Sequence, residues 1–156
     1  MLAIRPARAD DSDAVIAIVR ASITHGCVAD HHDDADTLAR WLSNKTPTHF
    51  RSWLAEPDNH LVIALADDDR LAGVGMLHRS GEIRLFFIAP GMRRRGIGTA
   101  IHASLEAQAR AWGLPRLHLH STWLARTFYA ALGYRSCGDA EVLFEALRGF
   151  PYEKVL

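Results

Sequence analysis

The stretch "IAPGMRRRGIGTA", residues 88–100, joins a strand-like pattern to a helix-like pattern. The apolar run "EIRLFFI" (82–88) predicts a strand, and the apolar spacing in "TAIHASLEAQARAW" (99–112) predicts a helix with one buried face. Unpaired N–H groups and a partial positive charge at a helix N-terminus suit a phosphate group. We therefore interpret residues 88–100 as an anion-binding loop that opens the helix. The alternative is a solvated basic turn whose glycines allow a tight bend.

The residue types in this loop fit a diphosphate. Gly96 and Gly98 have no Cβ to hold an anion away from the backbone, and they tolerate left-handed dihedral angles. A guanidinium can close over a diphosphate, and the hydroxyl of Thr99 can bond the same oxygens. The guanidinium groups belong to Arg93, Arg94 and Arg95. Nucleotide hydrolysis and hydride transfer are disfavoured, because no lysine follows the glycines and no acidic residue stands at the spacing of a dinucleotide-binding fingerprint.

The rest of the chain extends this pattern into a single α/β domain spanning residues 1–156. Period-two or continuous apolar runs predict strands at 2–7, 60–66, 71–78, 82–88 and 116–121, with one or two more after Tyr134. Helical spacing predicts helices at 10–23, around 38–42, and at 46–57, 99–112 and 123–132. A strand–loop–helix–strand unit therefore lies at the centre of the sheet.

Composition excludes several function classes. The 18 lysine and arginine residues are balanced by 18 aspartate and glutamate residues, so no overall charge attracts nucleic acid or a membrane. No apolar run approaches the ~20 residues of a membrane span, and the N-terminus has no signal-peptide core. Cys27 and Cys137 are too few for a disulfide framework. We expect a cytoplasmic protein with no nucleic-acid or membrane partner; RNA binding by the arginine loop is disfavoured because no aromatic residues are interleaved with the basic ones.

Two segments carry a resemblance to a known family. "RRRGIG" after "FIAPG" resembles the Arg/Gln-x-x-Gly-x-Gly/Ala signature of the GNAT N-acetyltransferase superfamily, which binds the pyrophosphate of coenzyme A. "LHLHSTWLARTFYAALGY" (117–134) resembles the strand and helix that follow in that family, including its Phe-Tyr helix motif. The resemblance covers residues 1–137, is strongest over 60–135 and is weakest over 25–58.

This resemblance implies a GNAT-like mixed sheet flanked by helices, whose central parallel strands splay apart to form an acyl-CoA cleft. The strand at 86–88 would offer backbone groups to the pantetheine arm and the acetyl carbonyl, and the loop at 93–99 would hold the pyrophosphate. The residues implied to contact acetyl-CoA are Phe86, Phe87, Ile88, Arg93, Arg94, Arg95, Gly96, Ile97, Gly98, Thr99, Thr122 and Ala125. Thr122 departs from the family pattern, since many members carry Asn there; Thr can also cap the helix.

The resemblance also implies catalytic residues. Tyr129 matches the tyrosine that gives a proton to the departing thiolate, and a phenol within hydrogen-bond reach can do so. The alternative is that Tyr129 is a core aromatic residue. Glu82 matches the glutamate that serves as a base in the histone-acetylating branch, although it could equally be a turn residue in solvent. The rival bases are His78, His118 and His120, since imidazole titrates near neutrality.

The polar stretch "HGCVADHHDDAD" (25–36) corresponds to the region that lines the acceptor pocket in the family. Its aspartates would attract a cationic amine, and two tryptophans would form apolar walls; the alternative is a solvated loop. These residues are Asp30, Asp33, Asp34, Asp36, Trp41 and Trp53. We expect no metal, because the ligand types His31, His32, Asp33 and Asp34 are adjacent and adjacent residues rarely converge on one ion.

The sequence thus predicts an acetyl-CoA-dependent N-acetyltransferase in which a primary amine, on a small molecule or a peptide, attacks directly in a ternary complex. The alternative is a non-catalytic acyl-CoA-binding module of the same fold. Members of this family are often dimers, so the resemblance also implies a homodimer. The C-terminal "FPYEKVL" (150–156) would be an edge for strand exchange between copies.

Overall fold

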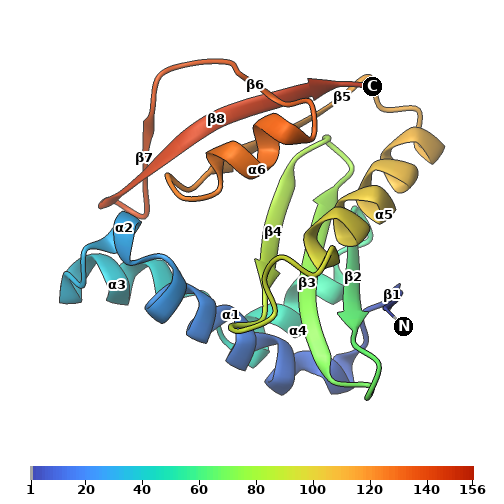
Figure 1. Cartoon of the computed structure of the whole chain (residues 1–156), viewed down its shortest axis with the longest axis horizontal. Helices are drawn as coiled ribbons and strands as arrows, with labels where there is room; N and C mark the ends of the chain where they lie inside the picture. The colour runs from blue at the N-terminus through green and yellow to red at the C-terminus, as the bar shows by residue number, and fades with distance from the viewer. Residues whose placement is uncertain (1) are drawn as a thin grey trace.

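The computed structural model describes residues 2–156, and its first sheet is antiparallel (Figure 1). The strands β1 (Ala3–Pro6), β2 (Asn59–Leu65), β3 (Leu71–His78) and β4 (Ile83–Ile88) pair in that order. Strands β2 and β3 are buried along most of their length, as expected for continuous apolar runs covered on both faces. These four strands lie close to the ranges that the sequence predicts.

A second sheet follows in the chain. Strand β8 (Leu147–Val155) lies between β5 (Arg116–Ser121) and β6 (Arg135–Ser136), and β7 (Glu141–Leu143) also pairs with β8. The tail therefore holds three strands, where the sequence predicted one or two. The C-terminal strand, expected as an exchange edge, has partners from its own chain on both sides in this order.

Helices cover both faces of the first sheet (Figure 1). On one face lie α1 (Ser12–Gly26), α3 (Ala35–Leu42) and α4 (Pro47–Ala55), and on the other lies α5 (Ile97–Ala111). The two short helices are α2 (Val28–His31) and α6 (Arg126–Ala131), and the one-turn η1 (Ala9–Asp11) precedes α1. The sequence did not predict α2, whose four residues are too few for a periodic pattern.

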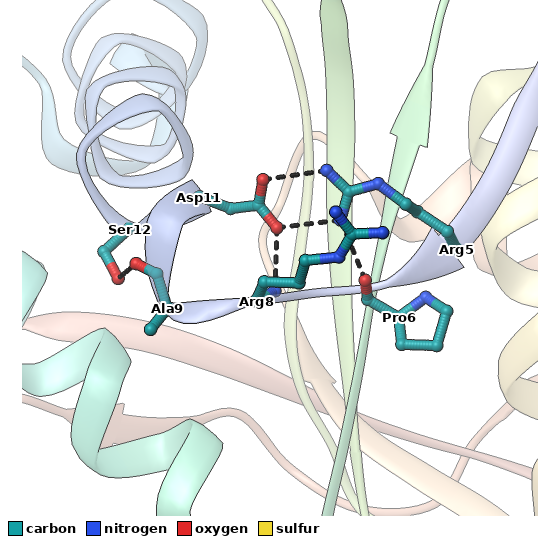
Figure 2. A network of polar contacts seen from close by, with 6 residues as sticks. All are labelled: Arg5, Pro6, Arg8, Ala9, Asp11 and Ser12. Carbon is teal, nitrogen blue, oxygen red and sulfur yellow. Dashed lines mark hydrogen bonds and ion pairs between the residues drawn. The ribbon is translucent and has the colours of Figure 1, made fainter.

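Capping side chains fix where the helices begin. The hydroxyl of Thr46 accepts the N–H of His49 at the start of α4, and Asp34 accepts the N–H of Thr37 at the start of α3. Before α1, the carboxylate of Asp11 accepts hydrogen bonds from Nη1 and Nη2 of Arg5, each at 2.9 Å, and from the N–H of Arg8 at 2.7 Å (Figure 2). The hydrogen bond from Arg5 is the main cause that lowers the pKa of Asp11. This network ties β1 to the start of α1.

The core is divided by the sheet into two clusters. On the α5 face, Ile101 and Leu105 pack over the glycines of β3, and Tyr129 and Tyr134 belong to the same cluster. On the α1 face, the largest fully buried side chains of the cluster are Phe50, Ile23 and Ile63. Among residues 2–156, no helix is both long and apolar enough to cross a bilayer.

One buried polar pair lies in the first cluster. The Nε2 atom of His102 is 2.8 Å from the hydroxyl of Tyr134, and both side chains are almost fully buried. Burial lowers the pKa of His102 from 6.5 to about 4. The folded state therefore holds this imidazole neutral in a pH range where an unfolded chain would protonate it.

This pair predicts an acid-sensitive stability. Between about pH 6.5 and pH 4 the unfolded chain binds a proton that the folded chain does not, so the free energy of unfolding falls as the pH falls. We expect His102→Gln, which keeps a hydrogen-bonding group but cannot titrate, to remove up to about 3 kcal/mol of this pH dependence. Urea unfolding of both proteins at pH 7 and pH 4 measures the difference; equal pH slopes would contradict this assignment.

Candidate active site

The site begins where β4 and β5 come together and then separate. Their contact is a single parallel bridge between Glu82 and His118, with the N–H of His118 donating to the carbonyl of Gly81 at 3.0 Å. A Cβ on Gly81 would lie 2.7 Å from the carbonyl oxygen of Arg116, so this close approach requires glycine. Beyond the bridge, the two strands line a cavity of about 720 Å³.

The pairing of β4 leaves part of its backbone facing this cavity. The N–H of Ala89 donates to the carbonyl of Ala72. In an antiparallel pair every second residue bonds its partner strand through its main chain, so Phe87 bonds β3 as well. The main-chain groups of Phe86 and Ile88 then point away from β3, toward the side where β5 has diverged. Among the described residues, the carbonyl of Ile88 accepts the hydroxyl of Ser22 at 2.7 Å. Phe86, Phe87 and Ile88 all line the cavity.

The arginine-glycine loop forms one end of the cavity. Gly96 stands immediately before α5 in the left-handed region (φ 76°), and a Cβ there would meet nothing within 4 Å, so its backbone conformation accounts for the glycine. Gly98 has a different reason, because its Cβ would lie 3.0 Å from the ring of Phe128. No side chain caps the first turn of α5. The N–H groups at this end are therefore open to an anion.

The three arginines do not lie alike. Arg93 lines the cavity and packs on the end of α1, since a Cβ on Gly26 would lie 2.5 Å from its Nη2 atom. Arg94 also lines the cavity and has a positive φ of 64°. Arg95 is exposed and is not part of the cavity wall, so the structure does not bring it to the site as predicted. Ile97 and Thr99 are in the wall with the glycines.

The opposite wall comes from the segment that follows β5. Thr122 and Ala125 line the cavity, and the hydroxyl of Thr122 accepts the N–H of Ala125 at 3.1 Å. Thr122 therefore holds the turn that leads into α6. The N-cap residue of this helix is Ala125 and no side chain caps it, so Thr122 does not have the capping role that the sequence allowed. Helix α6 places Phe128 and Tyr129 in the cavity wall, with Phe86 5.6 Å from the first ring and 6.0 Å from the second.

Tyr129 is the tyrosine that faces the cavity. It is 6% exposed, and burial raises the pKa of its hydroxyl well above the ordinary value of 10. The phenol therefore stays protonated and can act as a hydrogen-bond donor throughout the physiological range. The ring of Tyr134 lies 5.5 Å from that of Tyr129, but its hydroxyl is hydrogen-bonded to His102, and neither Tyr134 nor His102 lines the cavity.

Two of the four candidate bases lie in the cavity wall. Glu82 and His120 line the cavity, whereas His78 and His118 do not. The Glu82 carboxylate accepts Nε of Arg84 at 2.6 Å, and Nε2 of His120 is 2.6 Å from Glu141. Glu82 therefore lies within the cavity wall on β4's side of the splay, close to the β4–β5 bridge.

The aspartates expected to attract the acceptor lie outside the cavity wall. None of Asp30, Asp33, Asp34 and Asp36 lines the cavity. Asp30 instead accepts the N–H of Trp123 at 2.6 Å, which joins α2 to the turn before α6. His31 is buried with Nε2 2.8 Å from the carbonyl of Ile23, which is a structural role. Trp41 does line the cavity, whereas Trp53 packs in the core beside Phe50.

The residues that replace these aspartates come from segments that the sequence analysis did not connect. Lys45, in the link between α3 and α4, lines the cavity, as do residues of the β7–β8 hairpin, whose tip reaches toward α2 (Figure 1). The hairpin residues in the wall are Leu143, Phe144, Leu147, Arg148 and Gly149. Arg40 of α3 bonds Glu145 at the hairpin tip. Only the tertiary fold brings residues 41–45 and 143–149 together.

Cys27 also lines the cavity, although it lies outside the sequence blocks that resemble the family. It is 5% exposed, and burial raises the pKa of its thiol to about 12. The thiolate is the nucleophilic form of cysteine. This thiol is therefore held in the unreactive state at neutral pH.

Lys45 is unusual because its ammonium group is buried. The residue is 6% exposed, and burial lowers its pKa from 10.5 to about 8. Between these two values the unfolded chain binds a proton that the folded chain does not, so below about pH 8 the buried charge costs stability. A residue retained at such a cost is a candidate for function.

We expect Lys45→Met to stabilise the fold at pH 7 by roughly 1–3 kcal/mol, since methionine fills similar space without a charge. Above pH 10.5 Lys45 is neutral in both the folded and the unfolded chain, so the difference in free energy of unfolding between the two proteins should shrink there. Denaturant unfolding of the two proteins at pH 7 measures the effect. A variant less stable than the wild type would show that the ammonium makes compensating interactions within the protein.

The cavity fits coenzyme A in its chemistry. At the loop end, Arg93 and Arg94 and the uncapped N-terminus of α5 provide positive charge and N–H donors for a diphosphate. Between the strands, the main-chain groups of Phe86 and Ile88 face the opening with the apolar Phe128 opposite. A donor set of this kind suits a chain that carries a diphosphate at one end and amide groups along its length.

The comparisons with known proteins agree with this geometry. Residues 27–156 match a family model described as an acetyltransferase (GNAT) domain. No curated protein sequence matches the chain. The solved structures similar to it include a GCN5-related N-acetyltransferase from Rhodopseudomonas palustris, at 24% identity over 99% of this chain and 95% of that one, with a TM-score of 0.87.

Two further similar structures contain the cofactor. The PaiA N-acetyltransferase of Thermoplasma acidophilum, in complex with coenzyme A, has 17% identity, covers 100% of this chain and 99% of its own, and has a TM-score of 0.86. A putative streptothricin acetyltransferase from Bacillus anthracis, in complex with acetyl coenzyme A, has 16% identity over 69% of this chain and 68% of its own, with a TM-score of 0.60. At these identities the likeness establishes the fold.

Proposed function

Because the chain belongs to the GNAT acetyltransferase family, we propose that it transfers an acetyl group from acetyl-CoA to a primary amine. The observation that carries this proposal is the cavity between β4 and β5, which has the arginine-glycine loop at one end and Tyr129 in its wall. The diphosphate binds the first turn of α5, with Arg93 and Arg94 beside it. The pantetheine arm then lies along β4, and this places the thioester at the splay.

In the proposed reaction the amine attacks the thioester carbonyl within a ternary complex. A nitrogen–carbon bond forms, the carbon–sulfur bond breaks, and the thiol of CoA leaves. A main-chain N–H of Phe86 or Ile88 donates to the thioester oxygen, where negative charge grows during the attack. Holding the amine and the thioester together supplies much of the rate.

The attack requires three proton transfers. Tyr129 gives its phenolic proton to the departing sulfur. Two observations support this role: its raised pKa keeps the phenol protonated, and its ring is part of the cavity wall. The attacking amine arrives as an ammonium ion and loses one proton before the attack. Glu82 lines the cavity and takes that proton, directly or through water, while Arg84 orients the carboxylate at 2.6 Å. The nitrogen loses a second proton after the nitrogen–carbon bond forms, and this proton replaces the one that Tyr129 gave to sulfur.

A covalent acetyl-cysteine intermediate is the competing route, because Cys27 lines the same cavity. The pKa of about 12 opposes it, since little thiolate exists at pH 7. We expect Cys27→Ala to retain kcat within about threefold, a change typical of a packing effect rather than of a lost nucleophile. Steady-state assays of free-thiol release measure this. A loss of turnover with unchanged acetyl-CoA binding would instead assign the attack to the thiol.

The direct test of the function is an assay of acetyl-CoA against a panel of amines, polyamines, amino acids and peptides, with mass detection of the product. We expect at least one acceptor to gain an acetyl group, with free CoA thiol released in equal amount. Calorimetry with acetyl-CoA is the companion measurement. Tight binding with no acetylation of any acceptor would favour a non-catalytic acyl-CoA-binding module.

A further inference from the structure

Lys45 carries a buried ammonium group on the acceptor side of the cavity, and the proposed mechanism does not use it. It lines the cavity between Trp41 of α3 and the β7–β8 hairpin, and its Nζ lies 4.8 Å from the centre of the Phe144 ring. An ammonium has three N–H donors. The hydrogen bonds among residues 2–156 use two of them, to Oδ1 of Asn44 at 2.5 Å and to the carbonyl of Trp41 at 3.3 Å.

The backbone around Lys45 is held in place. The guanidinium of Arg20, from α1, donates to the carbonyl of Lys45 at 2.9 Å and to that of Leu42 at 3.1 Å. The N–H of Lys45 donates to the same Leu42 carbonyl at 3.0 Å. These bonds fix the link between α3 and α4, so the ammonium is presented from a rigid support rather than from a mobile surface loop.

The charges around the acceptor side are unbalanced toward positive. Among the described residues, Lys45 forms no ion pair with a carboxylate, and Arg148 of β8 also lines the cavity. The one acidic residue in the cavity wall is Glu82, whose carboxylate is bonded to Arg84. Apolar side chains of the wall near Lys45 belong to Trp41, Leu143, Phe144 and Leu147.

We propose that the acceptor is an amine that also carries a carboxylate, and that Lys45 binds this carboxylate. The inference rests on the proposed function and adds the substrate class. A carboxylate would take the remaining N–H donor of Lys45 and neutralise its buried charge, while the apolar wall would contact the carbon skeleton between the two groups. Charge-assisted hydrogen bonds of this kind are short and stronger than neutral ones, and more so away from water. A purely cationic acceptor, such as a polyamine, would meet an unfavourable charge here.

The first test compares amino acids with their own carboxamides, which keep the shape and the amine but lose the negative charge. The panel covers the common amino acids, β-alanine and 4-aminobutyrate, each paired with its amide. For the best acceptor we expect kcat/KM to favour the carboxylate at least about tenfold in the wild type. In Lys45→Met this preference should fall below about threefold, with the Kd for acetyl-CoA unchanged. Dividing the carboxylate-to-amide ratio of kcat/KM in the wild type by the same ratio in Lys45→Met cancels the effect of the different basicities of the two amines.

Lys154→Met is the matched control, since it removes the same ammonium group from outside the cavity, where Lys154 pairs with Glu106. Lys154→Met should keep the wild-type preference for the carboxylate over the amide. Lys45→Arg retains the positive charge and should keep most of this preference, which separates loss of the charge from misfolding of Lys45→Met. If carboxylate and amide are used equally by the wild type, or if Lys45→Met leaves the preference intact, the inference is wrong while the acetyltransferase function stands.

The second test does not depend on turnover. Isocaproate, which has an apolar body and a carboxylate but no amine, is titrated in the presence of CoA against wild type and Lys45→Met, with isocaproamide as the neutral partner. We expect the variant to bind isocaproate at least about tenfold more weakly and isocaproamide equally. If the variant binds isocaproate more weakly but the wild type acetylates no amine, the proposed function is wrong and Lys45 still forms a carboxylate-binding site. Equal binding of isocaproate by both proteins would overturn the inference whatever the assays of turnover give.

Discussion

Tyr129→Phe is expected to lower kcat by about 100- to 10,000-fold, the range that a positioned proton donor contributes. The variant loses only the hydroxyl, so the ring keeps its contacts with Phe86, Phe128 and Tyr134, at 6.0, 5.2 and 5.5 Å. The Kd for acetyl-CoA should therefore change by less than about twofold, because the interaction lost belongs to the transition state. Single-turnover kinetics and calorimetry measure the two quantities.

Tyr152→Phe is the control for this prediction. Tyr152 lies on β8 opposite Leu119, outside the cavity wall, and it undergoes the same chemical change. It should leave kcat within about twofold of wild type, since its hydroxyl is remote from the reacting atoms. A Tyr129→Phe enzyme with wild-type kcat would remove Tyr129 from the reaction and leave it a core aromatic residue.

The second large effect is expected at the loop. Gly96→Val forces a branched side chain into a left-handed conformation, which costs about 1–2 kcal/mol unless the backbone changes. A change of backbone at Gly96 rotates the peptide groups that begin α5 and misaligns their N–H donors. We expect the Kd for CoA to rise about 100-fold, equivalent to about 2.7 kcal/mol. Calorimetry with CoA measures the change.

Gly113→Val provides the matched control at the other end of the same helix. Gly113 has φ 72° against 76° for Gly96, and a Cβ at either position would meet nothing within 4 Å. The two variants should therefore lose similar stability, and only Gly96→Val should lose affinity for CoA. Similar affinities in both variants would mean that the start of α5 does not hold the diphosphate.

Local patterns were enough to predict most of the fold. The strands at 60–66, 71–78 and 82–88 are continuous apolar runs, and the helix at 99–112 has one apolar face, so each carries its own signal. The start of that helix could also be predicted, since glycine suits the left-handed conformation that Gly96 adopts immediately before α5. The tail was harder, because β6 has two residues and β7 three, too few to show alternation.

The acceptor side could not be predicted because its residues meet only in the folded chain. Lys45 is far in sequence from the hairpin residues Phe144 and Leu147 that share its cavity. The acidic stretch at 30–36 suggested a cation-binding pocket, yet Asp30 is used to hold the N–H of Trp123. Likewise, Gly98 is required because a side chain there would meet the ring of Phe128. Gly81 is required because a side chain there would meet the carbonyl of Arg116, and both contacts join residues that are distant in the chain.

The most direct test of the account is a crystal structure of the protein with coenzyme A. The account predicts that the diphosphate oxygens lie about 3 Å from main-chain nitrogens at the start of α5, with the pantetheine arm beside Phe86 and Ile88. A diphosphate bound away from residues 93–99, or a pantetheine arm outside the opening between β4 and β5, would contradict it.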